Sequence, residues 1–147
     1  MYKIKFSHPD YGALFTHSAP WLDQQISVKW QQQQINTVIS LVETNYFDTA
    51  YYTNVNVINY PIEDFSVPSD RSSFKKLITK AVVLLKSGKN ISVHCYAGIG
   101  RTGIVAACIY GTMENVNGEQ ALAAVRRVNP DYAQTAHQEQ FIFSFLH

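Results

Sequence analysis

Four segments of the chain carry the hydrophobic pattern of β-strands. Residues 35–42 contain a near-continuous apolar run, 38–42, which is typical of a strand covered on both faces. Residues 55–60 alternate in part between apolar and polar positions, and residues 2–6 alternate with lysines, which favours an edge strand. A short β-branched run at 91–93 precedes a glycine-rich segment. We therefore predict a sheet that contains these four strands.

Other segments repeat their apolar side chains at helical spacing. One such helix is expected between a cap at Ser69 and a stop at Gly88. The run from Ile104 to Met113 is apolar nearly all round, so we expect this helix in the middle of the protein. The connection 43–53 gives no firm prediction, although a short helix fits there. Shorter amphipathic helices are predicted around residues 22–30, 121–125 and 141–146.

The order of these elements predicts the fold class. Strands come first, strands and helices then alternate, and helices dominate the end of the chain. This order is typical of an α/β protein with a central, mostly parallel sheet and helices on both faces. The 147 residues have the length of a single domain, placed at 1–147. The order of the strands within the sheet does not follow from the sequence.

Charge and cysteine content narrow the function classes. The formal net charge of +1 gives no overall field for nucleic acid or an acidic membrane, so we expect neither as a partner. Two cysteines do not make a disulfide framework and fit a reducing compartment. No signal peptide or membrane-spanning run is recognisable, which favours a cytoplasmic location, although secretion by a route without such a signal would look the same. We expect the protein to be a monomer.

One predicted helix combines an apolar stripe with a set of lysines. These lysines are either a solvated helix face or a docking surface, and the pattern favours the solvated face. They are Lys75, Lys76, Lys80 and Lys86.

The part of the chain with the strongest chemical signal runs from Val93 to Gly103, between a predicted strand and a predicted helix. A loop that ends at a helix N-terminus points several backbone N–H groups at one place, where the helix dipole adds positive charge. Gly98 and Gly100 allow the backbone to bend, and Arg101 adds a planar fork for two phosphate oxygens. The same dipole and arginine favour the thiolate of Cys95 over its thiol. This combination predicts attack of sulfur on phosphorus, and a buried cysteine in a plain turn is the alternative.

The segment HCYAGIGRTG, residues 94–103, resembles the signature loop of the cysteine-dependent protein tyrosine phosphatases, above all of the small dual-specificity enzymes. The resemblance runs from Ile35 to the end of the chain and implies an α/β sandwich and a phosphocysteine intermediate. It implies that Cys95 is the nucleophile, that His94 orients and tunes it rather than acting as a base, and that Thr102 donates its hydroxyl to the sulfur. The phosphate is then held by the backbone N–H groups and the arginine of Tyr96, Ala97, Gly98, Ile99, Gly100 and Arg101.

The departing oxygen needs a proton, and Asp64 is the candidate acid because PIEDFSVPS resembles the acid loop of the small dual-specificity enzymes. Glu63 is the alternative, and adjacent residues in an extended loop point opposite ways, so only one faces the thiolate. The acid then serves as the base for the water that cleaves phosphocysteine. The segment QTAHQ resembles the glutamine loop of the larger tyrosine-specific enzymes. Gln134 and Gln138 therefore either position that water or lie in solvent beside a helix capped by Thr135.

The expected substrate is a phosphorylated protein. Tyr96 and Ile99 are uncharged at positions that are basic in relatives acting on inositol lipids, which argues against polyphosphates. No counterpart of the tyrosine-clamping loop is clear in the first sixty residues, which suggests a shallow cleft, and Tyr96 and Phe65 favour phosphotyrosine. Phosphoserine and phosphothreonine remain open, as do inositol phosphates, RNA 5′-phosphates and a binding module without turnover. The chemistry needs no metal and no cofactor. Cys108 is either a redox partner of Cys95 or a small buried side chain, and the latter is favoured.

Overall fold

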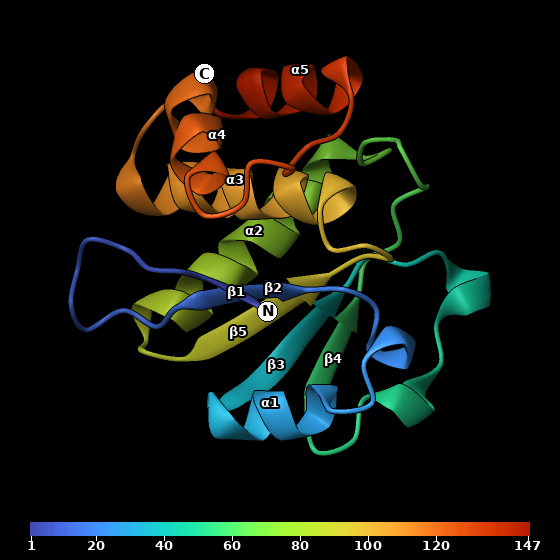
Figure 1. Ribbon diagram of the computed structural model, residues 1–147. Helices are drawn as coiled ribbons and strands as arrows, with labels where there is room; N and C mark the ends of the chain where they lie inside the picture. The colour runs from blue at the N-terminus through green and yellow to red at the C-terminus, as the bar shows by residue number, and fades with distance from the viewer.

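The computed structural model describes every residue from Met1 to His147, and it confirms the predicted α/β class with a five-stranded, mostly parallel sheet (Figure 1). The strands lie in the order β1-β2-β5-β3-β4. Only β1 is antiparallel to its neighbour, and it lies at the edge of the sheet as predicted. The strands are β1 (Tyr2–Ile4), β2 (Leu14–His17), β3 (Ile35–Ser40), β4 (Asn56–Asn59) and β5 (Asn90–His94).

Strand β2 is the one that the hydrophobic pattern did not reveal. Its residues are all buried, because the strand lies between β1 and β5. A strand covered on both faces shows no alternation, and so short a run has no distinctive length either. Its register with β5 places His17 directly beside His94. The strand therefore brings a second histidine under the segment that follows β5.

Helices cover both faces of the sheet, as predicted, but unequally. Helix α1 (Ile26–Gln32) lies alone on one face, and the other helices lie on the opposite face (Figure 1). The larger hydrophobic core, with 25 buried residues, fills the space beneath those helices, while the cluster that includes α1 has 7. Helix α3 is buried along most of its length, as its all-round apolar pattern predicts. The helices of this thicker layer are α2 (Arg71–Lys86), α3 (Gly100–Glu114), α4 (Gly118–Arg126) and α5 (Ala136–Phe145).

Two boundaries differ from the sequence prediction. The helix expected over 22–30 is split, because Pro20 starts a separate 3₁₀ turn, η1 (Pro20–Leu22), and Leu22 ends up half exposed outside α1. The cap of α2 is Asp70 rather than Ser69, since the Asp70 carboxylate accepts a hydrogen bond from the backbone N–H of Ser72. The unassigned connection after β3 contains two short 3₁₀ helices, η2 (Thr44–Tyr46) and η3 (Thr49–Tyr51). None of the helices combines the length and the apolar character needed to cross a bilayer.

Candidate active site

The glycine-rich segment follows β5, the middle strand of the sheet, and leads into α3. Parallel strands place such connections at their carboxyl ends, where α/β sheets bind ligands. Gly98 has a φ of +81°, and a Cβ there would lie 2.5 Å from the carbonyl oxygen of His17. Only glycine fits this close approach to the end of β2. The backbone N–H of Ala19 also donates to the Tyr96 carbonyl oxygen at 2.9 Å, so a hydrogen bond joins the loop to the segment just after β2.

Cys95 lies at the start of this loop with only 3% of its surface exposed. The Thr102 hydroxyl donates a hydrogen bond of 3.1 Å to the Cys95 sulfur. A hydroxyl that points at sulfur stabilises negative charge on it. The structure thus brings the Thr102 hydroxyl to the Cys95 sulfur, as the resemblance implies.

Arg101 lies in the first turn of α3 and is almost completely buried. Its Nη1 donates to the Ile62 carbonyl oxygen at 2.9 Å and pairs with a carboxylate oxygen of Glu43. Its Nη2 lies 3.3 Å from Asp64 Oδ1. Its Nε is shielded from solvent and has no hydrogen-bond partner in the protein. A buried N–H without an acceptor is costly, so this atom offers a donor to an oxygen of a bound molecule.

Glu43 is the member of this cluster that sequence reasoning missed. It follows Val42, at the end of the apolar run that contains β3, and it is the first acidic residue after that strand. Neighbouring parallel strands end at the same edge of the sheet, so an acid just beyond β3 comes close to the loop beyond β5. The position of Glu43 just after a predicted strand was therefore the sequence signal that could have identified it.

The two adjacent acids of the loop between β4 and α2 have different surroundings. Asp64 lines a pocket of about 400 Å³ together with Arg101 and Glu43, and Glu63 does not. The turn is closed by a hydrogen bond from the backbone N–H of Ser66 to the Glu63 carbonyl oxygen and by a positive φ at Phe65. The pairing with Arg101 therefore distinguishes Asp64 from its neighbour.

His94 supports the loop from below. Its Nδ1 is 2.9 Å from the Cys95 carbonyl oxygen, so this nitrogen carries the hydrogen, and its Nε2 is 2.8 Å from the Tyr52 hydroxyl. Burial is the main reason that the pKa of His94 is lowered to about 4. The hydrogen bond to the Cys95 carbonyl oxygen raises this pKa, and the nearby charge of Arg101 lowers it. The side chain is neutral at neutral pH and hydrogen-bonds the backbone of Cys95.

His17 extends this buried network, and its ring stacks on that of His94 with centroids 5.3 Å apart. Its Nε2 accepts a hydrogen bond of 3.1 Å from the Trp30 indole and lies 3.0 Å from Ser92 Oγ. Burial lowers the pKa of His17 to about 3, with the neighbouring His94 as the next cause. Sequence reasoning gave no hint of this second histidine, because β2 was not recognised.

The two glutamines of QTAHQ lie in different environments. Gln138 is fully buried: its Oε1 accepts from the backbone N–H groups of Gln134 and Thr135, and its Nε2 donates to the Ser66 carbonyl oxygen at 3.1 Å. Thr135 caps α5, as the alternative reading predicted, but Gln138 does not lie in solvent. Gln134 is exposed, and a Cβ on Gly100 would meet its Oε1 at 2.3 Å. Gln134 therefore lies over the start of α3, beside the loop.

Three aromatic side chains line the pocket that holds Asp64 and Arg101. They come from η1, η2 and the loop itself: Trp21, Tyr46 and Tyr96. The Trp21 and Tyr96 rings are 6.4 Å apart between centroids. Tyr96, predicted to lie near the site, therefore lines this pocket, whereas Trp21 and Tyr46 belong to connections whose position the sequence pattern does not give. Phe65 is exposed but does not line this pocket.

The second cysteine lies away from solvent in the middle of α3. Cys108 is fully buried, and burial raises its pKa far above the ordinary value of a thiol. A thiol that does not ionise is a poor nucleophile toward an oxidised sulfur. These surroundings favour the interpretation of Cys108 as a small buried side chain over its interpretation as a redox partner of Cys95.

Comparison with known proteins agrees with this geometry. The family model "Polymorphic toxin system, DSP-PTPase phosphatase" matches residues 16–113. The chain is 32% identical over 80 residues to Protein tyrosine phosphatase domain-containing protein 1 of Danio rerio, covering 54% of this chain and 11% of that protein. It is 28% identical over 103 residues to Cyclin-dependent kinase inhibitor 3 of Homo sapiens, covering 69% and 48%.

The solved structure of Tk-PTP in the active form has the same fold, with a TM-score of 0.77 and 22% identity over 92% of this chain and 90% of that one. The chain spans about half or less of the length of the curated relatives it matches. The family match covers well over half of the chain and includes the acid loop, the cysteine and the arginine. The chain therefore belongs to the family of polymorphic toxin system DSP-PTPase phosphatases.

Proposed function

We propose that this protein hydrolyses phosphate monoesters on proteins through a phosphocysteine intermediate, and that it prefers phosphotyrosine. The observation that carries the proposal is the buried Arg101 Nε, which has no acceptor in the protein. Arg101 lies in the first turn of α3, directly after the loop that starts at Cys95. A phosphate oxygen bound there satisfies this N–H and brings phosphorus within reach of the sulfur. Thr102, hydrogen-bonded to that sulfur, supports the thiolate form.

In the first step the Cys95 sulfur attacks phosphorus, an S–P bond forms, and the bond from phosphorus to the tyrosine oxygen breaks. Asp64, in its protonated form, gives that oxygen a proton. The phosphate dianion competes with Asp64 for Arg101, so substrate binding releases Asp64 to turn toward the leaving oxygen. Arg101 and the loop N–H groups stabilise the charge on the transferring phosphoryl group.

In the second step a water attacks the phosphocysteine, Asp64 takes its proton, and the S–P bond breaks to give phosphate and the thiolate. Thr102 makes the sulfur a better leaving group, because its hydroxyl bonds the thiolate as charge returns to it. Gln134 is the better placed of the two glutamines to orient the water, since both polar atoms of the Gln138 side chain already have protein partners.

The walls of the pocket support an aromatic substrate. Trp21, Tyr46 and Tyr96 line the pocket, and Arg101 and Asp64 are among the other residues that line it. Aromatic rings pack favourably on one another in offset or edge-to-face arrangements. A phosphoserine side chain is too short to present such a surface to these walls, so we expect phosphotyrosine to be preferred.

The test is the hydrolysis of a small aryl phosphate as a function of pH by four proteins: the wild type, Cys95→Ser, Asp64→Ala and Glu63→Ala. We expect Cys95→Ser to abolish turnover and Asp64→Ala to remove the basic limb of the pH profile. Glu63→Ala is the matched control and should leave the profile unchanged. Wild-type protein that binds phosphate but does not turn over any aryl phosphate or phosphopeptide would show a binding module instead.

A further inference from the structure

Helix α2 carries a concentration of positive charge that the proposed reaction does not use. Five of the twelve lysines and arginines of the chain lie on it, and it has no acidic side chain. None of the five takes part in an ion pair. The rest of the chain carries seven lysines and arginines and eleven acidic side chains, so it is net negative. Charge in this protein is therefore segregated onto one helix.

The arrangement of these charges is unfavourable for the helix itself. Arg71 and Lys75 are four residues apart, as are Lys76 and Lys80, and like charges at this spacing repel each other on a helix surface. Arg71 also lies in the first turn, where the helix dipole favours acids. An ordinary solvated helix face intersperses both signs of charge. The self-repulsion on α2 is relieved if an anionic partner binds there.

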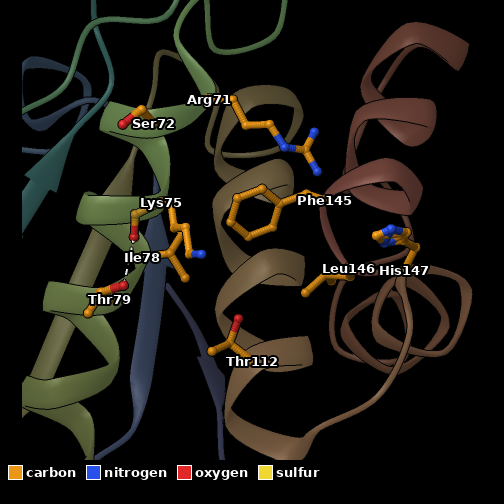
Figure 2. Close-up of a pocket in the computed structure, with 9 residues that line it drawn as sticks. All are labelled: Arg71, Ser72, Lys75, Ile78, Thr79, Thr112, Phe145, Leu146 and His147. Atoms are coloured by element: carbon orange, nitrogen blue, oxygen red, sulfur yellow. Dashed lines mark hydrogen bonds between the residues drawn. The ribbon is translucent and has the colours of Figure 1, made fainter.

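A groove of about 700 Å³ runs beside these cations, between α2 and the end of α5 (Figure 2). Ile78 from α2 and Phe145 and Leu146 from the last segment give it an apolar lining, and these side chains are buried or partly buried. Figure 2 shows Lys75 and Ile78 on one side, facing Phe145 on the other. The groove thus combines a recessed apolar surface with a positive rim.

The cations of the rim are not equivalent. Arg71 already has partners within the protein. Its Nη2 donates to the Ser144 carbonyl oxygen at 2.8 Å, and its guanidinium lies 5.4 Å from the centre of the Phe145 ring. It therefore closes one end of the groove. Lys75 also lines an adjoining hollow of about 430 Å³ with Lys76 and Lys80. These three lysines, without ion-pair partners, continue the positive rim along α2.

We propose that this groove and the three lysines bind an acidic segment of a partner protein, with an apolar side chain of that segment in the groove. Carboxylates of the segment pair with Lys75, Lys76 and Lys80. An aromatic or aliphatic side chain of the segment contacts Phe145 and Leu146, the partly exposed members of the apolar lining. Charge pairing at the rim steers association, and the buried apolar contact supplies most of the affinity.

A protein segment fits this surface better than a membrane or a nucleic acid. The apolar side chains line a hollow, where a peptide side chain reaches them and a flat bilayer surface does not. The only large exposed apolar residue of α2 is Val83, so the helix offers no set of side chains for insertion into lipid. A long polyanion also meets the net negative remainder of the molecule, whereas a short segment lies within the local field of α2.

The test measures binding of a fluorescein-labelled peptide, a phenylalanine flanked on both sides by glutamates, by fluorescence anisotropy at physiological salt. We expect saturable binding at about 10–100 µM peptide. The triple variant Lys75→Glu, Lys76→Glu, Lys80→Glu should weaken it by about tenfold or more. The matched control Lys3→Glu, Lys5→Glu, Lys89→Glu changes the net charge equally and should have little effect. Hydrolysis of a small aryl phosphate should be unchanged in both variants.

Two further arms make the outcome specific to the groove. Replacing the phenylalanine of the peptide by serine, or narrowing the groove with Thr112→Trp, should weaken binding while leaving the lysines in place. The proposal is overturned if the wild type does not bind the peptide, if both triple variants weaken it equally, or if the serine peptide binds as well. Tighter, α2-dependent binding of phosphatidylserine vesicles or of a single-stranded RNA would show that the partner class is wrong.

Discussion

Gln138 and Ser66 lie 72 residues apart in the chain, and the Gln138 side-chain amide donates a hydrogen bond of 3.1 Å to the Ser66 carbonyl oxygen. Ser66 belongs to the loop that carries Asp64, and Gln138 is a buried residue in the first turn of α5. The same side chain accepts from the backbone N–H groups of Gln134 and Thr135. One buried amide thus joins the acid loop to the segment that lies over the start of α3.

This relationship predicts the effect of Gln138→Ala. Removing the buried amide leaves three partly buried backbone groups without partners, so the free energy of unfolding should fall by about 1–3 kcal/mol. The acid loop also loses its anchor, so kcat on an aryl phosphate should fall. Urea unfolding and steady-state kinetics measure the two effects. Gln134→Ala, at an exposed position, is the control for stability. Equal stability of Gln138→Ala and the wild type would contradict the anchoring role.

Thr102→Val should slow the second chemical step more than the first. Valine removes the hydroxyl that bonds the Cys95 sulfur while keeping the shape of the side chain. Breakdown of the phosphocysteine should slow by about ten- to a hundredfold, since one donor to the departing charge is lost. Pre-steady-state kinetics should then show a burst of phenol release followed by slow turnover. Thr112→Val changes a threonine on the same helix that bonds the Cys108 carbonyl oxygen, and it should turn over normally. A variant of Thr102 without a burst would argue against the assigned role.

The two buried histidines predict a loss of stability in acid. Both have a pKa below 6.5 in the folded protein, about 4 for His94 and about 3 for His17, so the unfolded chain binds their protons more readily. The stability that comes from these two neutral histidines is therefore fully present above pH 6.5, and it is lost as the pH falls toward their folded-state pKa values. At pH 5 each should contribute roughly 2 kcal/mol of destabilisation relative to pH 8. Urea unfolding across this range measures the slope.

Substituting one of these histidines should make the pH dependence shallower. His17→Gln keeps a polar side chain without a titrating group, so its unfolding free energy should vary less between pH 8 and pH 5 than that of the wild type. His137→Gln, at an exposed position of α5, should leave the slope unchanged. The same slope in His17→Gln and the wild type would show that His17 is not held neutral by the fold.

The repulsion along α2 predicts that Lys76→Glu stabilises the protein. The change replaces a like-charge pair by an acid four residues before Lys80, the favourable orientation for such a pair. The gain should be about 0.5–1 kcal/mol at low salt and smaller at high salt. Thermal unfolding of Lys76→Glu and of the control Lys89→Glu, which lies outside the helix, measures it. Equal or lower stability of Lys76→Glu would contradict the repulsion.

The parts of the site that the sequence could predict are those encoded by one continuous stretch. Cys95, Arg101 and Thr102 are close in the chain, and the strand–loop–helix pattern around them fixes their relative positions. The acid loop was recognisable because PIEDFSVPS resembles the acid loop of the small dual-specificity enzymes. The sheet class followed from the alternation of strands and helices, and the structure confirms it.

The parts that could not be predicted depend on contacts between distant segments. Glu43 and Trp21 reach the pocket because the connections after β3 and β2 end at the same edge of the sheet, which requires the strand order. The link from Gln138 to Ser66 exists only once α5 packs beside the acid loop. Periodicity reports which face of an element is buried, and it carries no information about which elements become neighbours.

The most direct test of the central claim is to trap the covalent intermediate on Asp64→Ala. With p-nitrophenyl phosphate, whose leaving group needs little protonation, the first step should proceed without the acid, while the second step lacks its base. Acid quenching and peptide mass spectrometry should then find one phosphoryl group, on Cys95. A phosphoryl group on another residue, or turnover by the wild type with no phosphorylated cysteine detected in the variant, would contradict the proposed mechanism.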